Sequence, residues 1–342
     1  MIEGHGDDLY KYDGIKMNFS SNTNCYADLK PLEQHLKTVL EKAIASYPEP
    51  QPKRLEALIA DRSGILPEEV CVTAGATEAI YLIAQTFKGS KSVIPQPTFS
   101  EYADACHIHN HIVSLGATLE GARLVWLCNP NNPTGKVIPK DFLKETISKS
   151  KETFFVIDQS YESFTLCPLL TDKEAVKMGN VLLIHSMTKR YAIPGLRLGY
   201  IVGDKGLLGC VRAQRMPWSV NSLAIEAGIF LTYSGEDKPS PLQESQRLRN
   251  KLNEISGIET FDSDTHFFLA RLTNGKASDL KEYLARQHGI LIRDASNFPT
   301  LDQSFFRIAA RTPEENDFLI EAIRKFLNPD SSKDTRRKRV AY

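Results

Sequence analysis

The chain has 342 residues, with 42 lysines plus arginines and 42 aspartates plus glutamates, so its formal net charge is zero. Because no excess of positive charge would attract a polyanion over distance, this balance argues against nucleic-acid or membrane partners and favours a small-molecule partner. The six cysteines lack the paired spacing of a metal site, which predicts buried thiols, no metal and a reducing compartment. Without a leader-like start or an apolar run near ~18 residues, we expect a cytoplasmic protein.

Between about residues 50 and 235, short apolar stretches alternate with stretches that have helical periodicity. Strands buried on both faces are near-continuous runs of Val, Ile and Leu, and their alternation with helices is typical of a parallel sheet. This region therefore predicts an α/β fold with a mostly parallel central sheet covered on both sides. The expected strands are VCVT, KSVI, RLVWLC, TFFVID, NVLLIHS and LRLGYIVG.

The pattern changes after about residue 240, where a polar helix (QESQRLRNKLNEI) precedes strands HFFLARL, ILIRDAS and FFRIAAR. The last helix should begin at Thr312, because Pro313 follows it and Glu315 can complete a capping box. These elements predict a smaller α+β domain. We expect an N-terminal arm that contributes to the small domain (1–47), a large domain (48–238), a C-terminal small domain (239–330) and a basic, disordered tail (331–342).

Polar residues follow several of these strands, and ligands of open α/β sheets collect at the carboxyl ends of strands. In TAGATEAI a strand runs through Gly75 into a helix that begins near Ala76 and Thr77. Free backbone amides and a hydroxyl at a helix N-terminus suit a phosphate. A glycine is also common in any strand-to-helix turn, so this stretch alone is a weak signal.

Two further strand ends carry hydrogen-bonding groups. NPNNPTG includes Asn132, which could donate to a ring oxygen of a planar ligand, although the segment could simply be a rigid turn. VIDQSY places Asp158 at the end of a strand and Tyr161 three residues later. The carboxylate could cap the next segment, or it could hold a ring nitrogen protonated, because a nearby anion raises the pKa of a cationic acid.

The stretch SMTKRYAIPGLRLGY carries a lysine, Lys189, at the end of the strand NVLLIHS. A strand-end lysine is usually a surface residue. Here Ser186 and Thr188 flank it, and Arg197 can fold back through the Pro194–Gly195 turn. Hydroxyls and a guanidinium bind phosphate, and a lysine held among them can form a Schiff base.

Together these strand ends supply phosphate ligands from two loops, a carboxylate for a ring nitrogen, an amide and a phenol for a ring oxygen, and a lysine for an aldehyde. Pyridoxal 5'-phosphate is the cofactor that needs this set of groups. The sequence therefore predicts a pyridoxal-phosphate enzyme.

The ordered series GATE, PTF, NPNNPTG, DQSY, SMTK and GLRLGY resembles the fold-type I enzymes of the aminotransferase class I and II superfamily over nearly the whole chain. The resemblance implies that Lys189 binds the cofactor covalently and that Asp158 pairs with the pyridinium nitrogen. It also implies a homodimer with shared active sites. The other implied cofactor-binding residues are Asn132 and Tyr161 at the ring hydroxyl, Ala76, Thr77, Ser186, Thr188 and Arg197 at the phosphate, Phe99 stacked on the ring, and Tyr47 at the partner's phosphate.

Two branches of the superfamily compete: the threonine-phosphate decarboxylases of cobalamin biosynthesis and the histidinol-phosphate aminotransferases. An HG motif with His5, NFSSNTN with Asn22, MPWSVN and ILIRDASNFPTLDQSFFRIAAR resemble the decarboxylases more closely. This implies decarboxylation of L-threonine O-3-phosphate to (R)-1-aminopropan-2-ol phosphate, with His5, Asn22, Arg293 and Arg307 binding the substrate. Since both branches use the two arginines, an aminotransferase acting on histidinol phosphate or another phosphorylated substrate stays open.

The chain also departs from the pattern of its relatives. DQSY stands where they usually have DEAY or DEAF, and Ala74 precedes Gly75 where they have GNG, which weakens the choice of branch more than the cofactor chemistry. A ligand-sensing regulator would be a different class of protein with a similar domain. It would need a DNA-binding module, and the sequence offers no basic helix-turn-helix segment for one.

Overall fold

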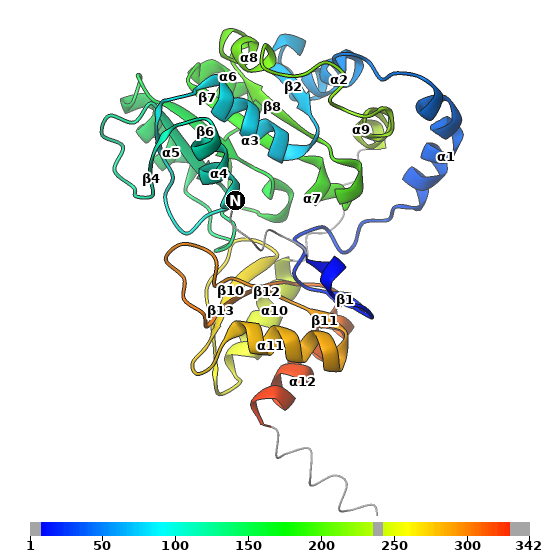
Figure 1. Cartoon of the computed structure of the whole chain (residues 1–342), viewed down its shortest axis with the longest axis vertical. Coiled ribbons are helices and arrows are strands. Elements are labelled where there is room, and N and C mark those ends of the chain that lie inside the picture. Colours follow the sequence, from blue (N-terminus) through cyan, green and yellow to red (C-terminus); the bar gives the residue numbers. More distant parts are fainter. Residues whose placement is uncertain (1–7, 235–241, 329–342) are drawn as a thin grey trace, which may run out of the picture. The chain divides into compact units, whose positions relative to one another are not determined.

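The computed structural model describes residues 8–234 and 242–328, which form two compact units (Figure 1). The smaller unit comprises the described residues within Met1–Asn22, Pro133–Gly135 and Ser240–Tyr342, and the larger comprises those within Thr23–Asn132 and Lys136–Pro239. The predicted substrate residue His5 and the basic tail at 331–342 lie outside the described residues.

The larger unit contains a seven-stranded sheet in the order β2-β8-β7-β6-β5-β3-β4. Strands β3 to β7 pair in parallel, whereas β8 is antiparallel to both of its neighbours. The predicted α/β class with a mostly parallel sheet is confirmed. The strands are β2 (Val70–Thr73), β3 (Lys91–Val93), β4 (Ile112–Ser114), β5 (Leu124–Cys128), β6 (Phe154–Asp158), β7 (Val181–Ser186) and β8 (Gly199–Gly203).

Helices connect these strands, and their ends follow local sequence signals. Helix α6, for example, begins at Asp172 because the Thr171 hydroxyl accepts the Glu174 backbone N–H in a capping box. No helix within the described residues is long and apolar enough to cross a membrane. The helices are α1 (Lys30–Ala45), α2 (Lys53–Ser63), α3 (Gly75–Thr86), α4 (Glu101–Ile108), α5 (Lys140–Lys149), α6 (Asp172–Met178), α7 (Met187–Tyr191), α8 (Lys205–Arg212) and α9 (Ser222–Ser234), with short 3-10 turns at Pro67–Glu69, Glu162–Phe164 and Pro194–Leu196.

Helices cover both faces of the sheet at β7 and β8. Gly199 of β8 lies opposite Ser186 of β7, and a Cβ added to it would lie 2.8 Å from the backbone nitrogen of Ala76 in α3. The preceding residue of β7, His185, contacts Asp172, the first residue of α6. Because successive residues of a strand point to opposite faces, α3 and α6 lie on opposite sides.

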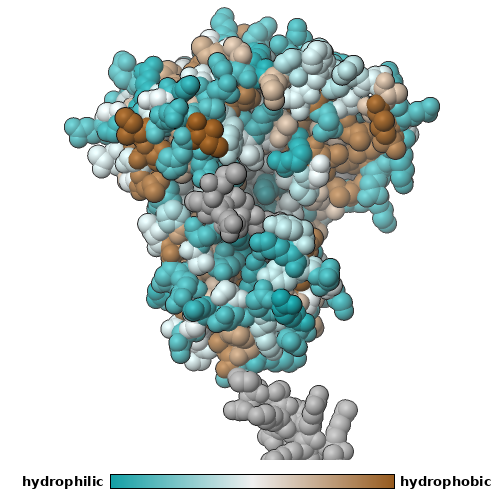
Figure 2. Space-filling model, in the orientation of Figure 1, coloured by the Kyte–Doolittle hydropathy of each residue, from teal (hydrophilic) through white to brown (hydrophobic). Residues whose placement is uncertain are grey.

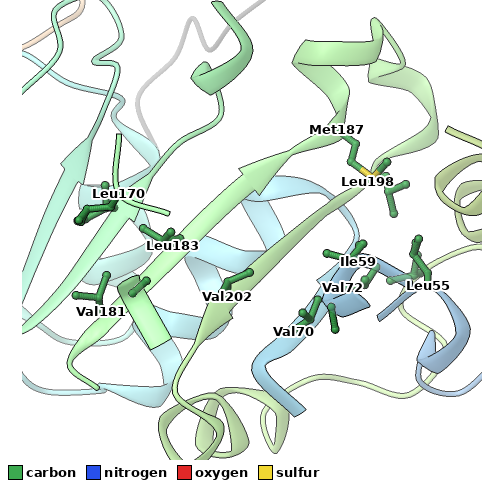
Figure 3. Packing of buried hydrophobic residues seen from close by; sticks show 14 of the residues in the cluster. Leu55, Ile59, Val70, Val72, Leu170, Val181, Leu183, Met187, Leu198 and Val202 are labelled. Carbon is green, nitrogen blue, oxygen red and sulfur yellow. The ribbon is translucent and has the colours of Figure 1, made fainter. Parts of the chain in front are cut away.

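The core of the larger unit is built from the aliphatic residues of these strands and of the helices beside them (Figure 3). Met187, which opens α7, and Leu198, which precedes β8, belong to this core at the two ends of one loop. Burying each such side chain contributes roughly 1.5–3 kcal/mol. Labelled strand residues in Figure 3 are Val70 and Val72 of β2, Val181 and Leu183 of β7, and Val202 of β8.

The smaller unit has a four-stranded antiparallel sheet, β12-β13-β10-β9, and a parallel pair of β1 and β11. Its capped last helix begins after Thr312, as predicted. The stretch ILIRDAS, expected as one strand, is divided: β11 pairs with β1, and after Ile292 β12 pairs with β13. The elements are β1 (Met17–Asn18), β9 (Ile258–Thr260), β10 (Phe267–Leu272), β11 (Ile290–Leu291), β12 (Arg293–Asp294), β13 (Phe305–Ala309), α10 (Leu242–Asn253), α11 (Ala277–Tyr283) with a π-helical turn at Leu284–His288, and α12 (Pro313–Leu327), preceded at the start of the chain by a 3-10 turn, Leu9–Lys11.

The cysteines are less uniformly buried than the sequence suggested. Cys71, Cys106 and Cys128 are buried, whereas Cys25 and Cys167 are half-buried and Cys210 is exposed. The prediction of buried thiols therefore holds only for the three that lie in or beside apolar elements.

Candidate active site

Two distant segments meet where α3 begins. A Cβ added to Gly75 would lie 2.8 Å from Nη2 of Arg197, so the guanidinium packs against the first turn of the helix. Arg197 has φ +58°, a left-handed conformation that costs a non-glycine residue on the order of 1–3 kcal/mol. Gly199 brings β8 close to the same turn. A cation and the free amides of a helix N-terminus together form an anion-binding arrangement.

Helix α7 carries the candidate lysine directly after β7. Lys189 and Ser186 are half-buried there, and Thr188 is buried. Within the described chain, the Thr188 Oγ1 atom is buried without a hydrogen-bond partner. A buried hydroxyl that lacks a partner is costly, so this atom is suited to bind a ligand oxygen.

Asp158 ends β6 and is buried with two hydrogen bonds to its carboxylate. The Tyr102 hydroxyl donates to Oδ2 over 2.7 Å, and the Ser160 backbone N–H donates to Oδ1 over 2.9 Å. Burial, and then the charge of Asp158, raise the pKa of Tyr102 well above its usual value, so the phenol stays a neutral donor. Both hydrogen bonds orient the carboxylate.

Tyr102 was missed in the sequence. It lies in the first turn of α4, three residues after Phe99, and the two rings meet edge to face with centroids 5.8 Å apart. On its other side it stacks on Trp126 of β5, 5.5 Å away. The available signal was an aromatic residue three positions after Phe99, at the start of the helix expected there.

Side-chain amides hold the two loops that carry Phe99 and Asn132. The Thr98 hydroxyl donates to Oδ1 of Asn131 over 2.9 Å, and Nδ2 of Asn131 donates to the Pro97 carbonyl over 3.0 Å. Asn129 closes its own loop by two hydrogen bonds with the backbone of Ile138. The first two asparagines of NPNNPTG are therefore structural, and Asn132 is buried beside them.

The DQSY stretch forms a tight turn after β6. The Glu162 N–H donates to the Gln159 carbonyl, and the Gln159 side chain donates to the Leu170 carbonyl over 3.1 Å. Tyr161 is thereby buried within the same turn as Asp158. The side chain of Gln159 thus serves a backbone contact.

Tyr47 follows α1 and is 89% exposed in the single chain, with its ring 5.8 Å from that of Trp218. Leu40 and Ile44 of α1 and Met216 are also exposed. Figure 2 shows brown, hydrophobic surface on the side of the larger unit where Figure 1 places α1. Such a patch on a monomer is typical of a protein interface.

In the smaller unit, the two predicted substrate arginines lie directly opposite each other. Arg293 of β12 pairs with Arg307 of β13, so both side chains project from the same face, and both are buried. Nη2 of Arg293 donates to Oδ1 of Asn297 over 2.9 Å, and Nη2 of Arg307 donates to the Ser20 carbonyl over 2.6 Å.

Burial lowers the pKa of Arg293, yet an arginine keeps its charge in proteins. The charges of Asp8 and Asp294 act against this effect of burial. Two buried guanidinium groups on one face of a sheet are suited to bind an anion such as a phosphate. Asn22, the third predicted substrate residue within the described chain, is also buried in this unit.

Residues 14–323 match the family model for aminotransferase class I and II. The chain belongs to this family, whose members are pyridoxal-phosphate-dependent enzymes, and the resemblance seen in the sequence is confirmed.

Individual relatives come from both predicted branches. The chain is 38% identical to the solved L-threonine-O-3-phosphate decarboxylase from Porphyromonas gingivalis, over 91% of this chain and 99% of that one, with a TM-score of 0.88. It is 29% identical to the threonine-phosphate decarboxylase of Salmonella typhimurium, over 91% of each protein. It is 30% identical to the histidinol-phosphate aminotransferase of Thermoanaerobacter pseudethanolicus, over 86% of this chain and 89% of that protein.

Proposed function

We propose that the protein is a pyridoxal-phosphate-dependent decarboxylase that converts L-threonine O-3-phosphate to (R)-1-aminopropan-2-ol phosphate in cobalamin biosynthesis. The observation that carries a phosphorylated substrate is the buried, directly opposed pair Arg293 and Arg307. The greater identity to the solved Porphyromonas decarboxylase favours decarboxylation over transamination.

Several features of the chain fit the cofactor. The buried Thr188 hydroxyl and the contact of Arg197 with the start of α3 suit its phosphate, to which we also assign Ala76, Thr77 and Ser186. We assign Lys189 as the residue that binds the cofactor covalently. The large pyridoxal-phosphate-binding domain would then be residues 48–238, followed by a small domain at 239–330.

The buried carboxylate of Asp158 suits the ring nitrogen, because an anion favours the protonated form of a neighbouring base. We assign Asn132 and Tyr161 to the ring hydroxyl and Phe99 to the ring face. When bound, pyridoxal phosphate accepts the electrons of the bond broken at the substrate's α-carbon.

The substrate residues would decide which bond is broken. The bond that aligns with the ring's π system is the one that reacts, so placement of the substrate selects the reaction. We assign Arg293, Arg307, Asn22 and His5 to the substrate phosphate. Anchoring the phosphate leaves the substrate carboxylate without a strong cationic clamp, and a tight clamp would stabilise the ground state and slow decarboxylation.

We propose a cytoplasmic homodimer with shared active sites. The exposed Tyr47, which the resemblance assigns to the partner's cofactor phosphate, lies beside exposed apolar residues. Burying Leu40, Ile44 and Trp218 in an interface would remove an unfavourable apolar surface from water.

A histidinol-phosphate aminotransferase is the second candidate, because relatives of that activity are 30% identical to this chain. The test is product analysis of purified protein with pyridoxal phosphate and L-threonine phosphate. Release of carbon dioxide and aminopropanol phosphate without an oxo-acid is expected. Turnover of histidinol phosphate that depends on 2-oxoglutarate, with no carbon dioxide from threonine phosphate, would establish the aminotransferase instead.

A further inference from the structure

His185 lies at the end of β7, buried between two carboxylates. Its Nε2 is 3.0 Å from Oδ1 of Asp172, and its Nδ1 is 3.1 Å from Oε1 of Glu162. Asp172 is held in turn by the Ser63 hydroxyl of α2, which donates to Oδ2 over 2.5 Å. The imidazole also stacks on Tyr200 of β8, with centroids 4.6 Å apart.

Nδ1 of His185 contacts Glu162 as an ion pair without hydrogen-bond geometry, and two carboxylates beside one imidazole favour the protonated ring. A neutral imidazole has one N–H, so one of its two nitrogens would lie beside a carboxylate oxygen without a proton. Burial lowers the pKa of His185, but the charges of Glu162 and Asp172 outweigh it and raise that pKa to about 10. The same positive charge lowers the pKa of Asp172 against the effect of its burial.

The position of this cluster in the chain links it to the candidate site. Glu162 directly follows Tyr161, and His185 directly precedes Ser186. The register of β6 with β7 ends at Asp158 and Ile184, and the Gln159 N–H donates to the Ile184 carbonyl just beyond it. Past that hydrogen bond, the pair of His185 with Glu162 ties the turn after β6 to the end of β7.

We propose that His185 is a positioning residue of the cofactor site, whose protonated ring, acting through Glu162, fixes Tyr161 relative to Ser186 and Lys189. The proposal rests on the proposed cofactor, and it adds a role that was not anticipated from the sequence. An apolar residue of the same size could fill the space but would leave Glu162 free to turn toward solvent, since its side chain is 34% exposed.

The test measures binding of pyridoxal 5'-phosphate to the full chain, freed of cofactor, for His185→Gln, Glu162→Gln and the double variant. His111→Gln is the matched control, because His111 is also buried and hydrogen-bonded but its partners are Ser92 and the Ala84 carbonyl. We expect each single variant to bind about 10-fold more weakly, and the control to change less than about twofold.

Two readouts distinguish positioning from a general loss of structure. Both substitutions break the pair of His185 with Glu162, and His185→Gln also removes the contact with Asp172, so the double variant should bind no more weakly than His185→Gln. In Glu162→Gln the imidazole of His185 loses one neighbouring carboxylate, so the pKa of His185 falls. The affinity of this variant for pyridoxal phosphate, relative to wild type, should therefore decline as pH rises from 6 to 9. The other titratable groups beside His185 keep their charge over this pH range. Asp172 stays ionised. Tyr200, next to Arg190 and Tyr191, stays neutral because burial raises its pKa.

Nitrogen NMR of labelled histidine adds a readout independent of the cofactor, with both His185 nitrogens protonated at pH 8. Wild-type-like binding by Glu162→Gln and His185→Gln, or a neutral His185 ring, would overturn the proposal while leaving the proposed function intact. If His185→Gln does not fold, the cofactor affinity of Glu162→Gln alone tests the proposal. Failure of the wild-type chain to bind pyridoxal phosphate would instead overturn the proposed function, and this role with it.

Discussion

The hydroxyl of Tyr102 lies 2.7 Å from the buried carboxylate of Asp158, and that phenol is held between the rings of Phe99 and Trp126. The two residues belong to different elements, α4 and β6, so the bond fixes the carboxylate through a contact that local sequence does not specify. It is therefore a sensitive point at which to test the assignment of Asp158.

Replacing Tyr102 with phenylalanine should weaken binding of pyridoxal phosphate about 10-fold. The change removes one donor to a charged acceptor, which is worth about 1.5–3 kcal/mol, and leaves the ring stack in place. Fluorescence titration measures the affinity. Tyr81→Phe is the control, since Tyr81 donates to Glu101 over 2.9 Å but makes no contact with Asp158; equal losses in both variants would contradict the prediction.

Lys189→Ala should remove the covalent link to the cofactor. The wild-type protein should show a visible absorption band, and borohydride reduction should attach the cofactor to Lys189, as mass spectrometry of the peptide will show. The exposed Lys205 provides the control Lys205→Ala, which should keep both signals. A reducible protein–cofactor link that persists in Lys189→Ala would refute the assignment.

Arg307→Gln should raise the KM for L-threonine phosphate by about 10- to 100-fold, because it removes a charge-assisted bond worth about 1.5–3 kcal/mol. Arg307→Lys should recover part of the loss, since it keeps the charge but not the planar fork. Steady-state kinetics measures both. Arg271→Gln is a suitable control because Arg271 pairs with Glu259 on the surface of the same sheet. An unchanged KM in Arg307→Gln would exclude Arg307 from substrate binding.

Subunits that carry Tyr47→Phe should complement subunits that carry Lys189→Ala. In a hybrid dimer, one site has an intact lysine from one subunit and an intact Tyr47 from the other, so activity should rise above that of either parent. Assays after mixing, with sedimentation to establish the dimer, provide the measurement. A fully active monomer at micromolar concentration would contradict the shared site.

Glu174 should contribute stability that depends on pH. Burial acts to raise the pKa of this carboxyl, but Lys140, the Thr171 backbone and Lys144 lower it to about 2. A carboxyl with a depressed folded-state pKa stabilises the protein fully above its unfolded pKa, and that stability is lost as pH falls from about 4.5 to about 2. Denaturant unfolding at pH 6 should therefore separate wild type from Glu174→Gln, and the gap should shrink by pH 3. A gap of equal size at both pH values would show that Glu174 acts only by packing or capping.

The sequence predicted the sheet well because its parallel strands are buried on both faces and therefore read as continuous apolar runs. It missed β4, which lies at the sheet edge with Ile112 exposed, because a strand of three residues is too short to give a continuous apolar run. It also treated ILIRDAS as one strand, since a change of pairing partner at Ile292 alters no residue type.

The residues of the candidate site likewise divide into those that the sequence revealed and those that it did not. Asp158, which ends β6, and Lys189, which follows β7, stand out because polar groups interrupt or follow apolar runs. Tyr102 and His185 did not stand out, because their partners lie on other elements and the distance along the chain hides the contact. Long-range hydrogen bonds between buried polar groups depend on the tertiary fold, and a single sequence does not encode them locally.

The loop of residues 187–198 begins after Ser186 and ends before Gly199, and these two residues face each other across the ladder of β7 and β8. The sheet thus joins the ends of the loop before any ligand arrives. Because the chain entropy of closing that loop is lost during folding, binding need not order the segment that carries Lys189 and Arg197. Substitutions inside the loop can therefore change the chemistry of its side chains while the strand pairing still holds its two ends together. This hairpin is thus a favourable place to engineer a different reaction on the same scaffold.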